Sequence, residues 1–251
     1  MKKVKKKINA SILVIGNEIL SGRTQELNVA FISSWLNKEC GISVSEARII
    51  PDIEKTIIFN VLDLSKKFNY VFTTGGIGPT HDDITAHSIA KALKVKYDFN
   101  AKAYKILENY YGKKKFNIGR KKMAKMPSRA SLILNPSSAA PGFKVKNIFC
   151  LPGVPSILKS MINNCKKFLK KGLVTFSKNI NGITVESNIS LELERVQNIF
   201  LKKVDVGSYP FFKDGKVGVS IVCRSVSKKE LNLCVNMIHK IFRKKNIKIL
   251  K

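Results

Sequence analysis

The chain has 251 residues, of which 44% are hydrophobic and 25% are charged, and its formal net charge is +29. This composition is typical of a globular protein and excludes an intrinsically disordered chain. No apolar run is long enough to cross a bilayer, so a membrane-spanning protein is excluded as well. The length allows one large domain or two modest ones.

The five cysteines are odd in number and none lies at C-x-x-C spacing, so we expect neither a disulfide framework nor a zinc site. Residues 1–9 are predicted to form a basic tail. The apolar run at 12–15 that follows is too short for the core of a signal peptide, and a cytoplasmic protein is expected.

The positive charge raises the question of nucleic-acid binding. Only seven of the 46 basic residues are Arg, which leaves 39 Lys, and the lysines are scattered along the chain. Proteins that read a nucleotide sequence favour Arg for its bidentate geometry. The charge therefore favours a compositional bias over a specific nucleic-acid site, although it should speed the capture of any anionic ligand.

The first half of the chain alternates between strand and helix patterns. Apolar residues at 3–4 spacing between Leu27 and Leu36 predict a helix that ends at Gly41. Strands are expected at 12–15, 42–50 and 70–72, with helices after the second strand and over 83–93. This order is the signature of a mostly parallel sheet with helices on both faces.

The pattern changes toward the C-terminus. Residues 100–126 are predicted to be helical but polar, and they are followed by short strands and by a helix from Pro155 to about Leu169. After residue 172 shorter elements predict a small α+β domain: strands at 183–188, 217–223 and 246–250, helices at 190–202 and 228–244. We therefore expect an α/β domain over 10–172 and a small α+β domain over 173–251.

A glycine-rich turn follows the third expected strand and includes Gly75, Gly76 and Gly78, then Pro79 and Thr80. Glycines let the backbone approach a ligand closely, and consecutive amides at such a turn bind anions. A turn at the carboxyl end of a parallel strand is also where α/β sheets bind ligands. The turn predicts a phosphate site, while a tight strand-to-helix connection without a ligand stays open as the alternative.

Acidic residues lie near this turn in the predicted fold. Asp82 and Asp83 follow it, Asp52 ends the neighbouring strand, and Glu18 follows the first strand. The aspartates can cap helices, and Glu18 can simply belong to a turn. Carboxylates beside a phosphate would repel it. A bound Mg²⁺ would remove this repulsion, because it bridges carboxylate and phosphate oxygens. His81 is a possible proton carrier or an exposed loop residue.

Several motifs together resemble a known family. The glycine turn with Asp83 and Thr85 is similar to the signature of the molybdenum-cofactor-biosynthesis (molybdopterin-binding) domain. The further motifs narrow the resemblance to the N-terminal region of the CinA (competence/damage-inducible protein A) family: 15–24, Asn28, Pro51-Asp52, Asn135-Pro136, 140–143, 151–155 and 207–210. The similarity spans about residues 10–250.

The resemblance implies a three-layer αβα sandwich followed by a small mixed domain, in proteins that are often dimers or trimers. It implies acidic activity positions at Asp52 and Asp83, with Glu18 as a tentative third metal ligand. The ligand-binding residues that we carry over lie in four loops: Gly16 and Asn17; Gly75, Gly76, Gly78, Pro79 and Thr80; Ser137; Pro152 and Gly153.

Family members bind molybdopterin or, in the CinA branch, hydrolyse the pyrophosphate of ADP-ribose-like or FAD-like dinucleotides with a divalent metal. Ile77 replaces a threonine common in the pterin-binding branch, which weakens the expectation of pterin specificity. The nicotinamide-mononucleotide deamidase activity of longer relatives is not carried over. We expect a metal-dependent pyrophosphatase, with a molybdopterin-binding protein and a non-enzymatic basic partner of nucleic acid or protein as alternatives.

Overall fold

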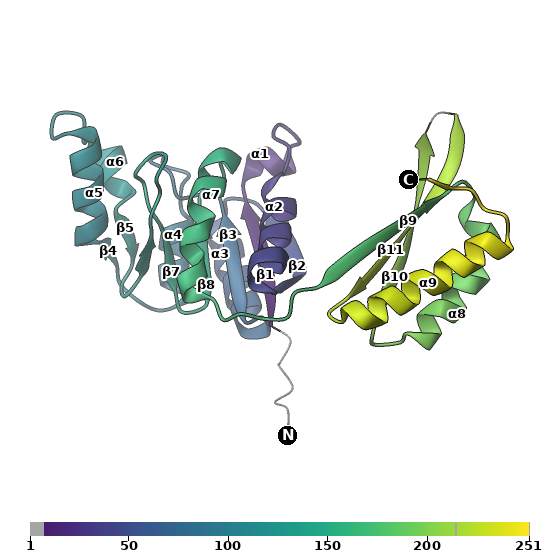
Figure 1. Ribbon diagram of the computed structural model, residues 1–251. Helices are drawn as coiled ribbons and strands as arrows, with labels where there is room; N and C mark the ends of the chain where they lie inside the picture. Colours follow the sequence, from purple (N-terminus) through teal and green to yellow (C-terminus); the bar gives the residue numbers. More distant parts are fainter. Residues whose placement is uncertain (1–7, 214, 251) are drawn as a thin grey trace, which may run out of the picture. The chain divides into compact units, whose positions relative to one another are not determined.

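The computed structural model describes residues 8–213 and 215–250, so most of the expected basic tail over 1–9 lies outside the described residues. The chain divides into two compact units, the first ending at Gly172 and the second beginning at Leu173 (Figure 1). Each unit has a hydrophobic core of its own.

The first unit contains a sheet that has six strands within the described residues. Its order is β2 (Ser43–Ile50), β1 (Asn9–Ile15), β3 (Tyr70–Thr74), β8 (Ile148–Leu151), β7 (Gly142–Val145) and β6 (Ser131–Ile133). The first four strands are parallel to one another, and β7 and β6 are antiparallel to their neighbours. The predicted mostly parallel sheet is confirmed.

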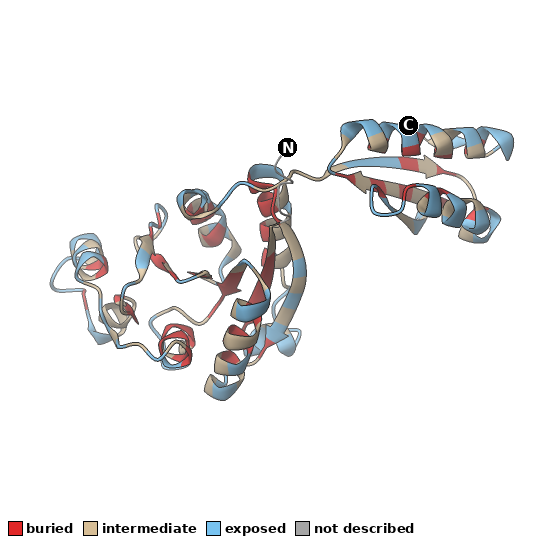
Figure 2. Ribbon diagram, turned by 90° about the horizontal axis from the view of Figure 1, so that it is seen from below, coloured by how far each residue is buried: buried red, intermediate tan, exposed pale blue. Residues whose placement is uncertain are grey.

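Helical layers cover both faces of this sheet, because side chains along β1 alternate between two cores. Leu13 and Ile15 pack into the core that includes residues of α3 (Glu54–Lys67) and α4 (Thr85–Ala92). Ile12 and Val14 pack into the core that includes residues of α2 (Asn28–Trp35) and α7 (Pro155–Met161). Apart from the first residues of β1 and β3, the residues of β1, β3 and β8 are buried (Figure 2), and the expected αβα sandwich is confirmed.

Short helical segments extend this framework. A turn of π-helix, η1 (Leu36–Cys40), continues α2 and ends at Gly41, whose φ of +66° is left-handed. A 3-10 segment, η2 (Ile162–Phe168), continues α7. A four-residue helix, α1 (Asn17–Leu20), follows β1 directly.

The segment between α4 and β6 differs from the single polar helix predicted over 100–126. It contains β4 (Tyr97–Phe99), α5 (Ala101–Tyr111), α6 (Ile118–Lys122) and β5 (Lys125–Pro127), with β4 and β5 paired antiparallel. The backbone φ of +73° at Gly112 ends α5, and the Asn117 side chain caps α6 by accepting a hydrogen bond from the N–H of Arg120.

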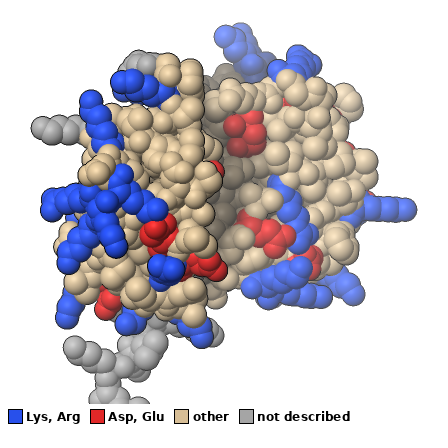
Figure 3. Space-filling model, turned by 90° about the vertical axis from the view of Figure 1, so that its right-hand side faces the viewer, with Lys and Arg blue, Asp and Glu red and all other residues tan. Residues whose placement is uncertain are grey.

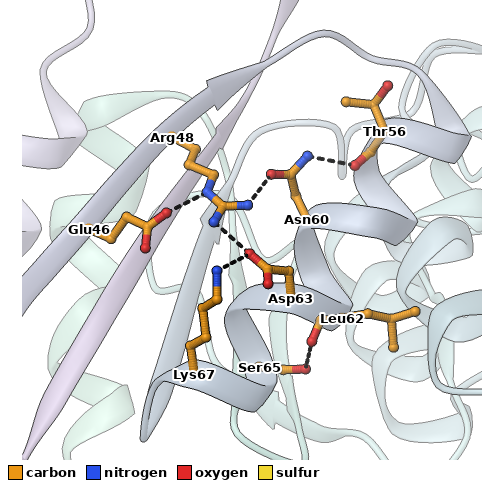
Figure 4. A network of polar contacts seen from close by, with 8 residues as sticks. All are labelled: Glu46, Arg48, Thr56, Asn60, Leu62, Asp63, Ser65 and Lys67. Atoms are coloured by element: carbon orange, nitrogen blue, oxygen red, sulfur yellow. Dashed lines mark hydrogen bonds and ion pairs between the residues drawn. The ribbon is translucent and has the colours of Figure 1, made fainter.

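A polar network joins β2 to α3 on the outside of the sheet (Figure 4). The guanidinium of Arg48 donates to Glu46, to the side-chain oxygen of Asn60 at 2.7 Å and to Asp63 at 2.6 Å. Lys67 donates to the same Asp63 oxygen at 2.9 Å. Arg48 thereby fixes the strand that leads into Asp52.

The second unit is an antiparallel α+β domain, as predicted. Its sheet order is β10 (Asp205–Lys213), β11 (Lys216–Ser225), β9 (Phe176–Gly182) and β12 (Ile249–Leu250). Between the strands lie η3 (Glu186–Asn188), α8 (Ser190–Ile199) and α9 (Lys228–Lys244). Residues from the sheet, α8 and α9, among them Ile221, Val196 and Ile238, form its core.

Two strand assignments in this unit change. The strand predicted at 183–188 is wrong, because the strand β9 ends at Gly182 and residues 186–188 form a 3-10 turn. The strand β10 was not predicted, since Pro210 interrupts its pattern. Proline is tolerated there because β10 is an edge strand, where a missing N–H removes no ladder bond that the sheet needs.

Candidate functional site

The loops that follow β1, β3 and β8 lie together at the carboxyl edge of the parallel strands. The N–H of Gly16 donates to the carbonyl of Ile50 at 3.1 Å, and the N–H of Gly75 donates to that of Leu151 at 3.1 Å. A Cβ placed on Gly153 would lie 3.3 Å from the Cα of Gly75. Three of the four loops carried over from the sequence therefore meet at one edge, where α/β sheets bind ligands.

The glycine turn requires glycine at two consecutive positions. Gly75 has a φ of +99°, and a Cβ there would lie 2.0 Å from the carbonyl oxygen of Ile15. Gly76 has a φ of +65°, and its Cβ would lie 2.1 Å from the hydroxyl oxygen of Thr85. Both positions combine left-handed backbone with a close approach of other atoms, so a side chain there would displace the turn.

The amides of this turn are available to a ligand. Within the described residues, the backbone N–H groups of Gly76, Ile77 and Gly78 donate to no protein acceptor. The end of the turn is held by Asp83: the N–H and the hydroxyl of Thr80 both donate to one of its carboxylate oxygens, at 2.8 and 2.5 Å. Successive unpaired amides in a turn form an anion-binding concavity.

Acidic side chains gather beside the turn. The Asp52 carboxylate accepts a hydrogen bond from the N–H of Asn17 at 2.9 Å. Burial raises the pKa of Asp52, the bond from Asn17 opposes that increase, and the negative charges of Glu18, Asp82 and Asp83 raise it further. The structure thus brings all four acidic residues into one electrostatic neighbourhood.

The helix-capping interpretation of these aspartates is wrong. The N-cap position of α3 is Ile53 and that of α4 is Ile84, and neither helix has a side-chain cap bond. Asp52 instead binds Asn17, and Asp83 closes the loop at Thr80. The carboxylates therefore hold loops at the sheet edge, which leaves their remaining oxygen atoms for another partner.

The acidic residues do not form a complete metal centre by themselves. Among the described residues, no three His, Cys, Asp or Glu side chains converge as a possible ligand set. The carboxylates of Asp52, Asp83 and Glu18 are nevertheless hard oxygen donors of the kind that Mg²⁺ takes.

Two pockets lie beside the glycine turn, one lined by residues that follow Gly75 and the other by Thr74, which precedes it. The lining of the first includes Gly76, Gly78, Asp83, Lys122 of α6 and Lys125 of β5. Tyr97, Pro141 and Phe143 are further lining residues.

The other pocket is reached from Thr74 and Gly153, and its lining includes Glu18, Glu26 and Asn28. Asn28 donates its amide N–H to the carbonyl of Gly153 at 2.7 Å, while its side-chain oxygen is buried without a partner in the described structure. The hydroxyl of Thr74 is likewise buried and unpaired. Two residues that line this pocket therefore each have a buried polar atom that the protein itself leaves without a hydrogen bond.

The remaining candidates lie at the margins. Ser137 is exposed in the loop between β6 and β7, its N–H donates to the Asn135 side chain, and it lines neither pocket. Pro152 is half-buried beside Gly153, and Pro79, Thr80 and His81 are exposed on the far part of the glycine turn.

The sequence analysis did not single out Lys122, Lys125 or Tyr97, which line the pocket beside Gly76 and Gly78. One signal was present, since the 77 residues between Glu108 and Glu186 contain sixteen Lys and Arg but no Asp or Glu. Lys122 and Lys125 belong to that stretch. On the face that Figure 3 draws, Lys and Arg lie in several groups, and Asp and Glu side chains lie on the same face.

The αβα sandwich, with the glycine turn and the acidic residues at one edge of its sheet, places the first unit in the α/β class. Residues 11–171 match the family model described as "Probable molybdopterin binding domain", and the chain belongs to that family. Residues 174–250 match the model for the middle domain of FAD synthase.

Individual relatives agree with this assignment. A protein of Archaeoglobus fulgidus is 32% identical over 86% of this chain and 91% of its own length. A protein of Sulfolobus acidocaldarius is 29% identical over 92% and 94%. The crystal structure of CinA from Thermoplasma acidophilum, described as of unknown function, is 32% identical with a TM-score of 0.61 and covers 64% of this chain and 98% of its own.

Among the described residues, no helix combines the length and the apolar character that a membrane crossing requires. The relatives and the fold therefore show a CinA-like, molybdopterin-binding-type domain followed by a domain of the FAD-synthase middle type.

Proposed function

We propose that the protein hydrolyses the pyrophosphate bond of a dinucleotide such as ADP-ribose or FAD with the help of a divalent metal ion. The observation that carries this proposal is the placement of three unpaired amides, at Gly76, Ile77 and Gly78, beside a group of carboxylates that includes Asp52 and Asp83. Amides alone would suit any anion, and carboxylates alone would repel one. Together they suit a phosphate that arrives with a cation.

The residues present fit a magnesium ion that is shared with the substrate. Mg²⁺ is commonly held by one or two carboxylates together with substrate phosphates, so the lack of a three-residue set among the described side chains is compatible with it. Asp83 and Asp52 would hold the ion, with Glu18 as a third donor. When bound, the metal would polarise a phosphoryl oxygen and activate a water molecule.

The protein's own groups have separate tasks in this proposal. The amides of the turn bind and orient one phosphate, and the Thr80–Asp83 hydrogen bonds keep the turn in shape. The bond from Asn17 holds Asp52 in position. Burial raises the pKa of Asp52, so its carboxylate ionises at a higher pH than that of an exposed aspartate, and metal binding there should strengthen as the pH rises through that pKa.

The test is a substrate panel of ADP-ribose, FAD and NAD, each with and without Mg²⁺, Mn²⁺ or Co²⁺. We expect metal-dependent release of a mononucleotide and its loss in Asp83→Asn. Asp98→Asn, an exposed aspartate on β4, is the matched control and should keep full activity. Equal turnover by Asp83→Asn and the parent protein would refute the assignment.

A second candidate function is the binding of molybdopterin. The family match over 11–171 favours it, since it is the ligand that the family description names. Equilibrium binding of molybdopterin and ADP-ribose to the same preparation separates the two candidates. Much tighter binding of molybdopterin, without hydrolysis of any dinucleotide, would replace the first proposal with the second.

A further inference from the structure

The pocket beside Gly76 and Gly78 has a cationic wall that the proposed chemistry has not used. Lys122 at the end of α6 and Lys125 at the start of β5 both line it. The carboxylate of Asp83, on the opposite side, already accepts two hydrogen bonds from Thr80. The charged residues that line the pocket are therefore two lysines and one aspartate, so positive charge exceeds negative charge among them.

These two lysines are held in place by other contacts, although the positive charge of Lys122 also contributes to lowering the pKa of Asp82. Lys122 donates through Nζ to the carbonyl oxygen of Thr80, and the Nζ of Lys125 lies 4.8 Å from the ring centroid of Phe99. Neither takes part in an ion pair with a carboxylate in the described part of the chain. A lysine that is oriented but unpaired retains its full charge for a ligand.

The helix that carries Lys122 also packs against the glycine turn. A Cβ placed on Gly119 would lie 3.2 Å from the carbonyl oxygen of Pro79, so α6 approaches the turn closely. This contact and the bond from Lys122 to Thr80 join the basic segment to the same loop whose amides face the ligand. The position of the lysines is thereby coupled to the position of the amides.

We propose that Lys122 and Lys125 bind the second phosphate of a pyrophosphate group whose first phosphate lies on the Gly76–Gly78 amides. This inference rests on the proposed function and adds a specificity to it: the site selects ligands with two linked phosphates over those with one. Lysine is a strong phosphate binder that acts as a point charge. A single phosphate could use the amides or the lysines, whereas a pyrophosphate uses both.

The test measures binding of inorganic pyrophosphate and inorganic phosphate by calorimetry, in EDTA so that no metal contributes. The parent protein should bind pyrophosphate at least tenfold more tightly than phosphate. In the double variant Lys122→Gln/Lys125→Gln, pyrophosphate affinity should fall roughly tenfold or more, because two charged donors to one phosphate are lost. Phosphate affinity should change much less.

A matched control removes the same charge from the same basic segment. Lys113→Gln/Lys114→Gln changes two exposed lysines between α5 and α6 and should leave pyrophosphate binding within about twofold of the parent. Equal losses in the two double variants would show a general charge effect and overturn the inference. Thermal unfolding of each variant confirms that it is folded, and Lys122→Arg should restore part of the binding.

The outcome is separable from that of the hydrolase proposal. If no dinucleotide is cleaved but pyrophosphate binding depends on the two lysines, the hydrolase assignment fails and the pyrophosphate site stands. If dinucleotides are cleaved and the variant Lys122→Gln/Lys125→Gln shows an unchanged KM, the hydrolase assignment stands and the lysine inference is wrong.

Discussion

The carboxylate of Asp52 accepts a hydrogen bond from the backbone N–H of Asn17 at 2.9 Å, which joins the end of β2 to the end of β1. Asp52 is also partly buried among other acids, so its pKa lies above the ordinary value of 3.8. Its folded form therefore binds a proton more readily than its unfolded form. An ionised Asp52 consequently lowers the stability of the fold while it prepares the site for a cation.

This arrangement predicts a gain in stability when the charge is removed. Asp52→Asn can still accept the bond from Asn17, and we expect its melting temperature at pH 7 to rise by roughly 1–3 °C. The gain should shrink as the pH falls through the raised pKa and vanish only well below the unfolded pKa of about 3.9, where Asp52 is protonated in both states. Thermal scans from pH 3.5 to 8 measure it, and a lower melting temperature at pH 7 would contradict it.

Replacing glycine in the turn should destabilise the first unit strongly. In Gly75→Ala the new Cβ would meet a backbone carbonyl oxygen at 2.0 Å, which no side-chain rotation can relieve. We expect a loss of about 3 kcal/mol or more, together with loss of ligand binding. The free energy of unfolding from urea titration gives the result.

The control for that variant is Gly22→Ala. Gly22 has a similar φ of +71° but nothing within 4 Å of its Cβ position. It should lose only the backbone strain of about 1–2 kcal/mol. If Gly22→Ala and Gly75→Ala lower the free energy of unfolding equally, the close approach of Gly75 to Ile15 does not contribute to the effect.

The Arg48 network should contribute more than an exposed ion pair does. Arg48→Met keeps an apolar stem but leaves the Asn60 side-chain oxygen without its donor and Asp63 with Lys67 alone (Figure 4). A loss of about 1–3 kcal/mol is expected. Lys91→Met, which removes a more exposed pair with Glu54, should change stability by less than about 0.5 kcal/mol. Similar values for both would show that the network adds nothing beyond single pairs.

The cysteines should be unreactive in the folded protein. All five are buried, and burial raises the pKa of Cys150 and that of Cys165 to about 12. Because the thiolate is the reactive form, an aromatic disulfide reagent at pH 8 should label almost none of them within minutes. The same reagent in guanidinium chloride should label all five. Rapid labelling of the native protein would show that one of the cores opens readily.

The sequence was most informative where structure depends on neighbouring residues. The apolar run at 12–15 predicted β1, and Ser227 to Lys244 carried enough periodicity and capping to predict α9. The glycine turn was visible because its geometry is imposed by Gly75 and Gly76 themselves. By contrast, Lys122 reaches a carbonyl 42 residues earlier in the chain, and no local pattern encodes that pairing.

Other elements escaped prediction because two signals conflicted. The strand β10 was not predicted; it contains Pro210, which is unfavourable inside a sheet and is accommodated here because β10 is an edge strand. The apolar residues Ile183 and Val185 suggested a strand that the polar run before Gly182 actually forms. Similarly, Asp52 and Asp83 stand where capping residues are common, but tertiary contacts with Asn17 and within the glycine turn occupy them instead.

Gly172 marks the end of the first unit with a specific anchor, since its N–H donates to the carbonyl of Cys40 at 2.8 Å and a Cβ there would meet the Gly41 carbonyl oxygen at 2.1 Å. Beyond it, a separate core begins. Heating should accordingly melt the chain in more than one calorimetric step, and a ligand of the glycine turn should shift only the step that belongs to the first unit. Such a shift would report binding without any assay of catalysis.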